Sequence, residues 1–131
     1  MTAEAKARCV RDALAEDLKH RVDQRRFVPF VIMHEFEGLL FSDCSAFSRA
    51  IFRPELETKL QSIRDQFATP EEINDSLETA PSKRVLRLVP GYQKPLLGVL
   101  AALEIGLARI RAECPHFNSW LTRLELLVQS R

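Results

Sequence analysis

The chain has 131 residues, of which 46% are hydrophobic, and its 19 Lys plus Arg against 18 Asp plus Glu give a net charge of +1. This length supports one hydrophobic core, so a single domain or domain fragment is expected over residues 1–131. The balanced charge excludes a protein-wide field for nucleic acid or anionic lipid, so any nucleic-acid role depends on a local patch.

No segment predicts export or membrane insertion. The amino terminus carries Glu4 and Lys6 where a secretory signal needs an apolar run. The longest nearly apolar stretch, residues 95–108, is interrupted by Glu104 and falls short of the roughly 18 to 20 residues that cross a bilayer. We therefore expect a cytoplasmic protein without membrane contact.

The first two elements in chain order are an expected helix and an expected strand. Residues 3–24 mix many charges with an apolar stripe at helical spacing, made of Val10, Leu14, Leu18 and Val22. Residues 27–33, Phe-Val-Pro-Phe-Val-Ile-Met, are a continuous apolar run that is rich in aromatic and β-branched residues and too short for a buried helix. We interpret this run as a buried strand.

Helical signals dominate the rest of the chain. One helix is expected to begin where the strand ends, over residues 34–41, and another at Pro54, with Leu56, Leu60, Ile63 and Phe67 inward. Thr69-Pro70-Glu71-Glu72 has the pattern of a capping box at a helix start. Further helices are expected over residues 79–90, over residues 95–114, and from Asn118 or Ser119 onward.

A lone buried strand has a physical difficulty. Each buried backbone group without a partner costs about 1 to 3 kcal/mol, and no second strand is evident in the sequence. We therefore expect that the strand pairs with another copy in a homo-oligomer, or that its sheet lies in sequence this chain lacks. The predicted fold class is α/β, as a mostly helical fragment with one buried strand and about five or six helices.

The segment His34-Glu35-Phe36-Glu37 follows this strand directly, where open α/β sheets bind ligands. Glu35 and Glu37 share a face if the strand continues, and His34 and Glu37 share one if a helix has begun. Either pairing suits Mg²⁺ or Mn²⁺ in phosphoryl-transfer chemistry, because neighbouring carboxylates repel unless a cation lies between them. The alternative is that these residues only cap a helix start.

A second charged segment contains Ser82-Lys83-Arg84 near an expected helix start. A hydroxyl, two cations and free backbone N–H groups are suited to bind a phosphate. The alternative is ion pairing with the acidic residues that precede them, which are Glu71, Glu72, Asp75 and Glu78.

The cysteines Cys9, Cys44 and Cys114 are odd in number and widely separated, which predicts free thiols rather than disulfides or a zinc ribbon. Cys114-Pro115-His116 is interpreted as a core cysteine followed by a histidine at a helix entry. Trp120, among several leucines, is interpreted as a core residue.

Together these segments resemble the bacterial domain-of-unknown-function 4276 family from Arg26 onward. The resemblance rests on Arg26-Phe27-Val28-Pro29-Phe30-Val31, His34-Glu35-Phe36-Glu37-Gly38-Leu39-Leu40-Phe41-Ser42-Asp43, Glu71-Glu72-Ile73-Asn74-Asp75, Glu78-Thr79-Ala80-Pro81-Ser82-Lys83-Arg84 and Cys114-Pro115-His116-Phe117.

The resemblance implies a relation to the Toprim fold, the metal-dependent α/β domain of topoisomerases, primases and certain nucleases, and a gene that often lies beside one encoding an ABC-type ATPase. It implies a nuclease-like component of a defence or mobile-element system, with His34, Glu35 and Glu37 in an acidic Mg²⁺ or Mn²⁺ site. Ser82, Lys83 and Arg84 match a second family motif. Because the family's upstream strand-helix elements are not in this sequence, we expect a carboxyl-terminal portion that is inactive alone. The alternative is a noncatalytic subunit that docks on the ATPase.

Overall fold

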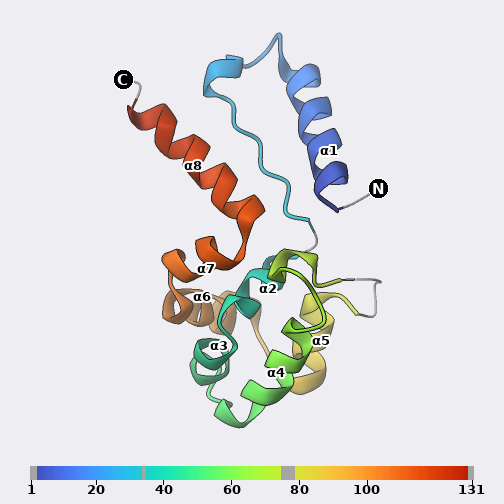
Figure 1. Cartoon of the computed structure of the whole chain (residues 1–131), viewed down its shortest axis with the longest axis vertical. Helices are drawn as coiled ribbons and strands as arrows, with labels where there is room; N and C mark the ends of the chain where they lie inside the picture. Colours follow the sequence, from blue (N-terminus) through green and yellow to red (C-terminus); the bar gives the residue numbers. More distant parts are fainter. Residues whose placement is uncertain (1–2, 34, 75–78, 130–131) are drawn as a thin grey trace. The chain divides into compact units, whose positions relative to one another are not determined.

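The computed structural model describes residues 3–33, 35–74 and 79–129, and within these ranges it contains eight α-helices and no β-strand. The chain divides into two compact units, one made of residues 1–33 and 115–131 and the other of residues 34–114 (Figure 1). We call them the terminal unit and the central unit. No described helix is long and apolar enough to span a membrane.

The α/β fold class predicted from the sequence, with a Toprim-like sheet, is therefore wrong for the described residues. The terminal unit contains α1 (Ala3–Leu18), the short 3-10 helix η1 (Gln24–Arg26) and α8 (Pro115–Gln129). The apolar run of residues 27–33 follows η1 in the chain and has no regular secondary structure (Figure 1). It is half-buried rather than buried.

Side chains of α8 take the place of a neighbouring strand. The indole N–H of Trp120 donates to the carbonyl oxygen of Val28 at 3.0 Å, and Nε2 of His116 lies 2.8 Å from the carbonyl oxygen of Val31. The Phe30 ring stacks on Trp120, with 4.8 Å between ring centroids. Two backbone acceptors that a ladder would have satisfied thus have side-chain partners, and the premise for expecting missing sheet sequence does not hold.

In its described residues, 35–74 and 79–114, the central unit has six α-helices and four short turns of other helix types. In chain order they are α2 (Phe36–Leu39), η2 (Leu40–Ser42), α3 (Cys44–Ala50), η3 (Pro54–Leu56), α4 (Glu57–Arg64), η4 (Pro70–Glu72), α5 (Pro81–Leu88), the π-helical turn η5 (Lys94–Gly98), α6 (Val99–Ile105) and α7 (Leu107–Glu113). The segment from α2 to α3 forms the centre of the core. There Phe41 and Phe47 meet edge to face at 5.6 Å between ring centroids. Leu60, Ile73 and Val85 are also fully buried.

Two glycines explain how helices approach and break in this unit. A Cβ on Gly38 would lie 3.0 Å from the carbonyl oxygen of Pro70, so glycine lets α2 pack closely against η4. Gly106 has φ 83° and ψ 149°, a conformation that favours glycine strongly, and it separates α6 from α7. The single helix expected over residues 95–114 is wrong for this reason.

Other helix boundaries also differ from expectation. The side chain of Thr69 makes no capping hydrogen bond, and the turn after it is the single 3-10 turn η4, so the capping box is wrong. The last helix begins at Pro115 rather than near Asn118, because proline fits the first helical position without losing a needed donor. His116 is accordingly a helix-entry residue, as predicted, and Cys114 is fully buried, as predicted.

Candidate functional site

The two charged segments singled out in the sequence meet in the central unit. Glu35 stands in extended conformation at the N-cap of α2, and Ser82 is the second residue of α5. The backbone N–H of Ser82 donates to Oε2 of Glu35 at 2.8 Å, although the two residues are 47 positions apart. The Glu35 carboxylate therefore occupies the anion-binding end of α5, where helix N–H groups lack partners.

Several groups act on this carboxylate. Partial burial raises the pKa of Glu35, but hydrogen bonds from Ser82 and then the positive charges of Lys94 and Lys83 lower it. The lowering causes prevail, and the pKa of Glu35 lies below its ordinary value. The site thus favours an anion at this position.

Glu37, two residues further on, is wholly buried. Its side chain has an exposed fraction of 0%, and neither carboxylate oxygen accepts a hydrogen bond. The Nζ atom of Lys94 lies 3.2 Å from Oε1 of Glu37, which is an ion pair by distance but lacks hydrogen-bond geometry. Burial, and then the charge of Glu37, raises the pKa of Tyr92, whose buried hydroxyl also has no hydrogen-bond partner.

Lys94 thus acts on both acidic residues: its ammonium group pairs with Glu37, and its charge lowers the pKa of Glu35. Its side chain is 55% exposed although Glu37 beneath it is not. The approach of Tyr92 depends on Gly98, because a Cβ there would lie 2.9 Å from the Tyr92 hydroxyl. The sequence reasoning did not single out Lys94, and no local signal links it to a segment nearly sixty residues earlier.

The three residues of the predicted phosphate site have different surroundings. Ser82 contacts Glu35, and Lys83 is exposed and acts on the same carboxylate through its charge. Arg84 is engaged elsewhere, because its Nε donates to the carbonyl oxygen of Thr79 at 2.6 Å and its guanidinium lies 5.4 Å from the centroid of the Phe67 ring. Ser82, Lys83 and Lys94 therefore form the anion site of α5, and we use that name for these three residues.

The described residues do not complete a metal site. No group of three or more His, Cys, Asp or Glu side chains suited to a metal ion occurs among them. Glu35 and Glu37 are two carboxylates with the Lys94 ammonium beside them, and His34, the third expected ligand, lies outside the described residues, as do Asp75 and Glu78. An octahedral Mg²⁺ ion would need further ligands from elsewhere.

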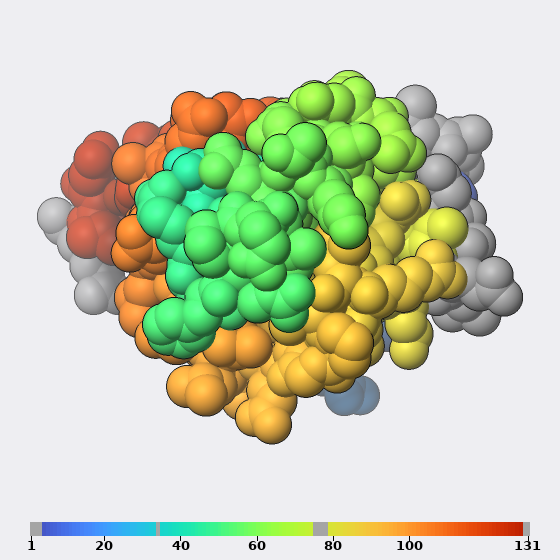
Figure 2. Space-filling view, turned by 90° about the horizontal axis from the view of Figure 1, so that it is seen from below, coloured from blue at the N-terminus to red at the C-terminus, as the bar shows by residue number. Residues whose placement is uncertain are grey.

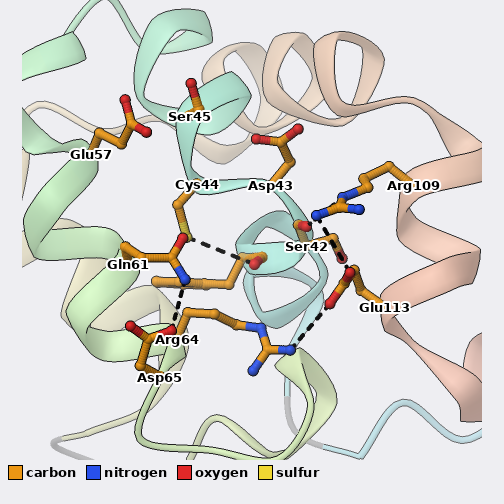
Figure 3. A pocket seen from close by; sticks show the side chains of 11 residues that line it. Ser42, Asp43, Cys44, Ser45, Glu57, Gln61, Arg64, Asp65, Arg109 and Glu113 are labelled. Atoms are coloured by element: carbon orange, nitrogen blue, oxygen red, sulfur yellow. Dashed lines mark hydrogen bonds and ion pairs between the residues drawn. The ribbon is translucent and has the colours of Figure 1, made fainter.

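A polar pocket of about 220 Å³ lies in a different part of the central unit, and none of the predicted site residues lines it (Figure 3). Its wall comes from η2, α3, α4 and α7. Both of its arginines face Glu113, with Arg64 at 3.2 Å and Arg109 at 3.4 Å from the carboxylate oxygens. Asp43 caps α3 by accepting from the N–H of Ala46. The pocket's charges are therefore largely committed to the fold.

The pocket also lacks an activated thiol. Cys44 is buried at its wall, and burial raises the pKa of this thiol to about 12. Cys114, whose sulfur lies 3.3 Å from the hydroxyl oxygen of Ser42, has its pKa raised to about 12 by burial as well. Both thiols stay protonated at neutral pH and are poor nucleophiles. All three cysteines are free, as predicted from the sequence.

The described residues thus form a helical protein with two notable acids. Glu35 lies at the amino terminus of α5, and Glu37 is buried beside Lys94. The chain belongs to the family described as domain of unknown function (DUF4276), whose model matches residues 2–125. No curated protein and no solved structure matches the chain.

Proposed function

We propose that this protein binds phosphate groups of nucleic acid through Ser82, Lys83 and Lys94, as the substrate-holding part of a nuclease-like component. One observation supports the proposal. The carboxylate of Glu35, an anion of the chain itself, accepts the Ser82 N–H at 2.8 Å with both lysine charges acting on it. A phosphodiester of nucleic acid carries the same single negative charge and offers the same kind of acceptor oxygen, so the same donors suit it.

In this proposal Glu35 competes with the phosphate. Displacing it frees the Ser82 N–H for the ligand, and the charges of Lys83 and Lys94 that act on Glu35 then act on the phosphate, while Lys94 stays beside Glu37. The competition predicts opposite changes in nucleic-acid affinity for the lysines and for Glu35. Removing a lysine weakens binding, whereas removing the negative charge of Glu35 strengthens it.

The experiment is fluorescence anisotropy of labelled single-stranded DNA and RNA with the full chain, across a salt series. Lys83→Ala should weaken binding and reduce the slope of log affinity against log salt by roughly one per lost phosphate contact. Glu35→Gln should tighten binding at every salt concentration. Lys59→Ala removes an exposed lysine from α4 and serves as the matched control, with no change expected.

Two results would overturn the proposal. One is an unchanged affinity and salt slope in Lys83→Ala, and the other is weaker binding in Glu35→Gln. Failure of the unaltered chain to bind either nucleic acid would favour the noncatalytic subunit as the function, with the Glu35 contact only a helix cap. Circular dichroism of each variant separates lost binding from lost folding.

The proposal extends to metal-dependent cleavage, for which the described residues do not contain enough metal ligands. It requires additional carboxylates beside Glu35 and Glu37, from a partner such as the expected ABC-type ATPase or from another segment. We therefore expect no Mg²⁺- or Mn²⁺-dependent cleavage by this chain alone. Cleavage that appears on adding the partner and disappears in Glu37→Gln would support this extension.

A further inference from the structure

Residues 27–33 place one phenylalanine ring in a cluster of rings on α8 (Figure 1). The Phe30 ring packs among three of them, with centroid distances between 4.8 and 5.9 Å. The three rings belong to His116, Phe117 and Trp120, and we call these residues the aromatic face of α8. A ring that enters a cluster of rings is how an anchor residue of a bound peptide is held.

The aromatic face also contacts backbone carbonyl groups on either side of the bound ring. The indole N–H of Trp120 donates to the Val28 carbonyl oxygen at 3.0 Å, and Nε2 of His116 lies 2.8 Å from the Val31 carbonyl oxygen. Two carbonyl groups three residues apart thus meet one helix, whereas the two-residue repeat of a strand would turn them to opposite sides. A repeat of three is that of a polyproline II helix, whose φ angle Pro29 favours. Aromatic-lined sites recognise peptides in this conformation.

The contact is shallow, unlike the packing of the central unit. Ala7 is the only buried residue among those described in the terminal unit, and residues 27–33 and α8 are half-buried or exposed throughout. The central unit instead has a core of fully buried side chains, and its green, yellow and orange segments form a continuous surface in Figure 2. Contacts that bury few side chains open at a lower free energy than a core. Residues 27–33 can therefore leave α8 while the central unit stays folded.

We propose that the aromatic face of α8 is a peptide-binding site, which residues 27–33 fill within the chain and which a segment of a partner protein takes over. The partner segment is extended and apolar, with a proline directly before an aromatic residue, as in the Val-Pro-Phe-Val of residues 28–31 that is seated there. Residues 27–33 then act as an autoinhibitory ligand that the partner displaces. The site lies outside the anion site of α5, and the proposal does not rest on nucleic-acid binding.

A labelled peptide with the sequence of residues 26–33 is the probe, and its fluorescence anisotropy with the full chain measures affinity. Phe30→Ala removes the competing ring of the chain itself and should lower the Kd of the peptide about tenfold or more relative to the unaltered chain. Phe52→Ala removes a phenylalanine of the central unit that is 76% exposed and is the matched control, with the affinity of the unaltered chain expected. If circular dichroism shows that Phe30→Ala loses helix, Phe30→Leu replaces it with the same expectation.

Two further measurements locate the bound peptide. Trp120 is the only tryptophan of the chain, so its emission should change when unlabelled peptide binds to the Phe30→Ala chain. Trp120→Ala added to Phe30→Ala should abolish binding, and so should a peptide with alanine in the place of Phe30. Absence of binding by a folded Phe30→Ala chain would overturn the proposal. Equal affinities of the unaltered and Phe30→Ala chains, or of the two peptides, would also overturn it.

Discussion

Glu37 and Glu113 are both withdrawn from solvent in the central unit, but their partners differ. Glu113 is 27% exposed and lies between two guanidinium groups, those of Arg64 and Arg109. Glu37 is 0% exposed, and a single ammonium group, that of Lys94, lies 3.2 Å from one of its oxygens. Neither oxygen of Glu37 accepts a hydrogen bond.

The surroundings of Glu113 compensate its negative charge well, whereas those of Glu37 compensate its charge poorly. Glu113 lies on α7 with Arg109 four residues before it, whereas Arg64 extends from α4, so the Arg64 contact ties α7 to α4 (Figure 3). Glu37 gains little from its surroundings, because a buried carboxylate without hydrogen bonds loses its hydration and recovers only the attraction of one cation. The burial of the Glu37 charge therefore depends on a single neighbouring cation, that of Lys94.

The largest expected effect comes from removing that neighbour. Lys94→Met keeps most of the apolar stem but leaves Glu37 as a buried, uncompensated charge. Breaking wholly buried pairs typically costs about 3 to 5 kcal/mol, and because Lys94 is half-exposed we expect a loss of about 2 to 3 kcal/mol. Urea unfolding followed by circular dichroism measures the change in the free energy of unfolding.

A double-mutant cycle identifies the cause of that loss. Glu37→Gln removes the buried charge, so adding it to Lys94→Met should recover much of the stability. A Lys94→Met chain as stable as the unaltered one would show that Glu37 is not supported by Lys94. Equal losses with and without Glu37→Gln would assign the effect to packing of the lysine stem.

A smaller loss of stability is expected when the ion pairs of Glu113 are weakened. Glu113→Gln replaces one acceptor oxygen by an NH₂ group that faces a guanidinium, and we expect a loss of about 1 to 2 kcal/mol in the free energy of unfolding. Glu55→Gln breaks an exposed ion pair with Arg53 and is the matched control, with no measurable change in stability expected. If Glu113→Gln changes stability no more than this control, the two arginines are held by other contacts.

The sequence predicts the helices of the central unit better than the fold class. Prolines and apolar spacing locate α4 and α5 correctly, because both signals are local. The run of residues 27–33 misleads, since an apolar β-branched segment looks the same whether a strand or a helix lies beside it. Here Phe30 packs on α8, whose side chains satisfy backbone carbonyls. That partner is some ninety residues away and leaves no local signal.

The candidate site divides in the same way. Glu35, Ser82 and Lys83 stand out in the sequence because acidic and basic residues cluster near expected helix starts. Their meeting depends on tertiary packing, which also decides that Arg84 contacts Thr79 and Phe67 instead. Lys94 escapes sequence analysis altogether, because a lone lysine before a proline is unremarkable until α2 lies next to it.

The smallest expected effect concerns Glu35, an acid of intermediate exposure. It accepts a hydrogen bond from Ser82, unlike Glu37, but its cationic partners are lysines rather than the arginines of Glu113. Its pKa in the folded protein lies below the ordinary value of 4.5, since the Ser82 hydrogen bonds and two lysines together outweigh burial. The stability that Glu35 contributes is therefore present above about pH 4.5 and is lost as the pH falls through the lower, folded-state pKa. Urea midpoints of the unaltered chain and of Glu35→Gln should differ by a constant amount near neutral pH, with the unaltered chain more stable. The difference should shrink steadily below about pH 4.5, because protonation makes Glu35 resemble the neutral glutamine. Parallel midpoints down to the lowest pH at which the chain folds would show that the carboxylate charge adds nothing to the α5 contact.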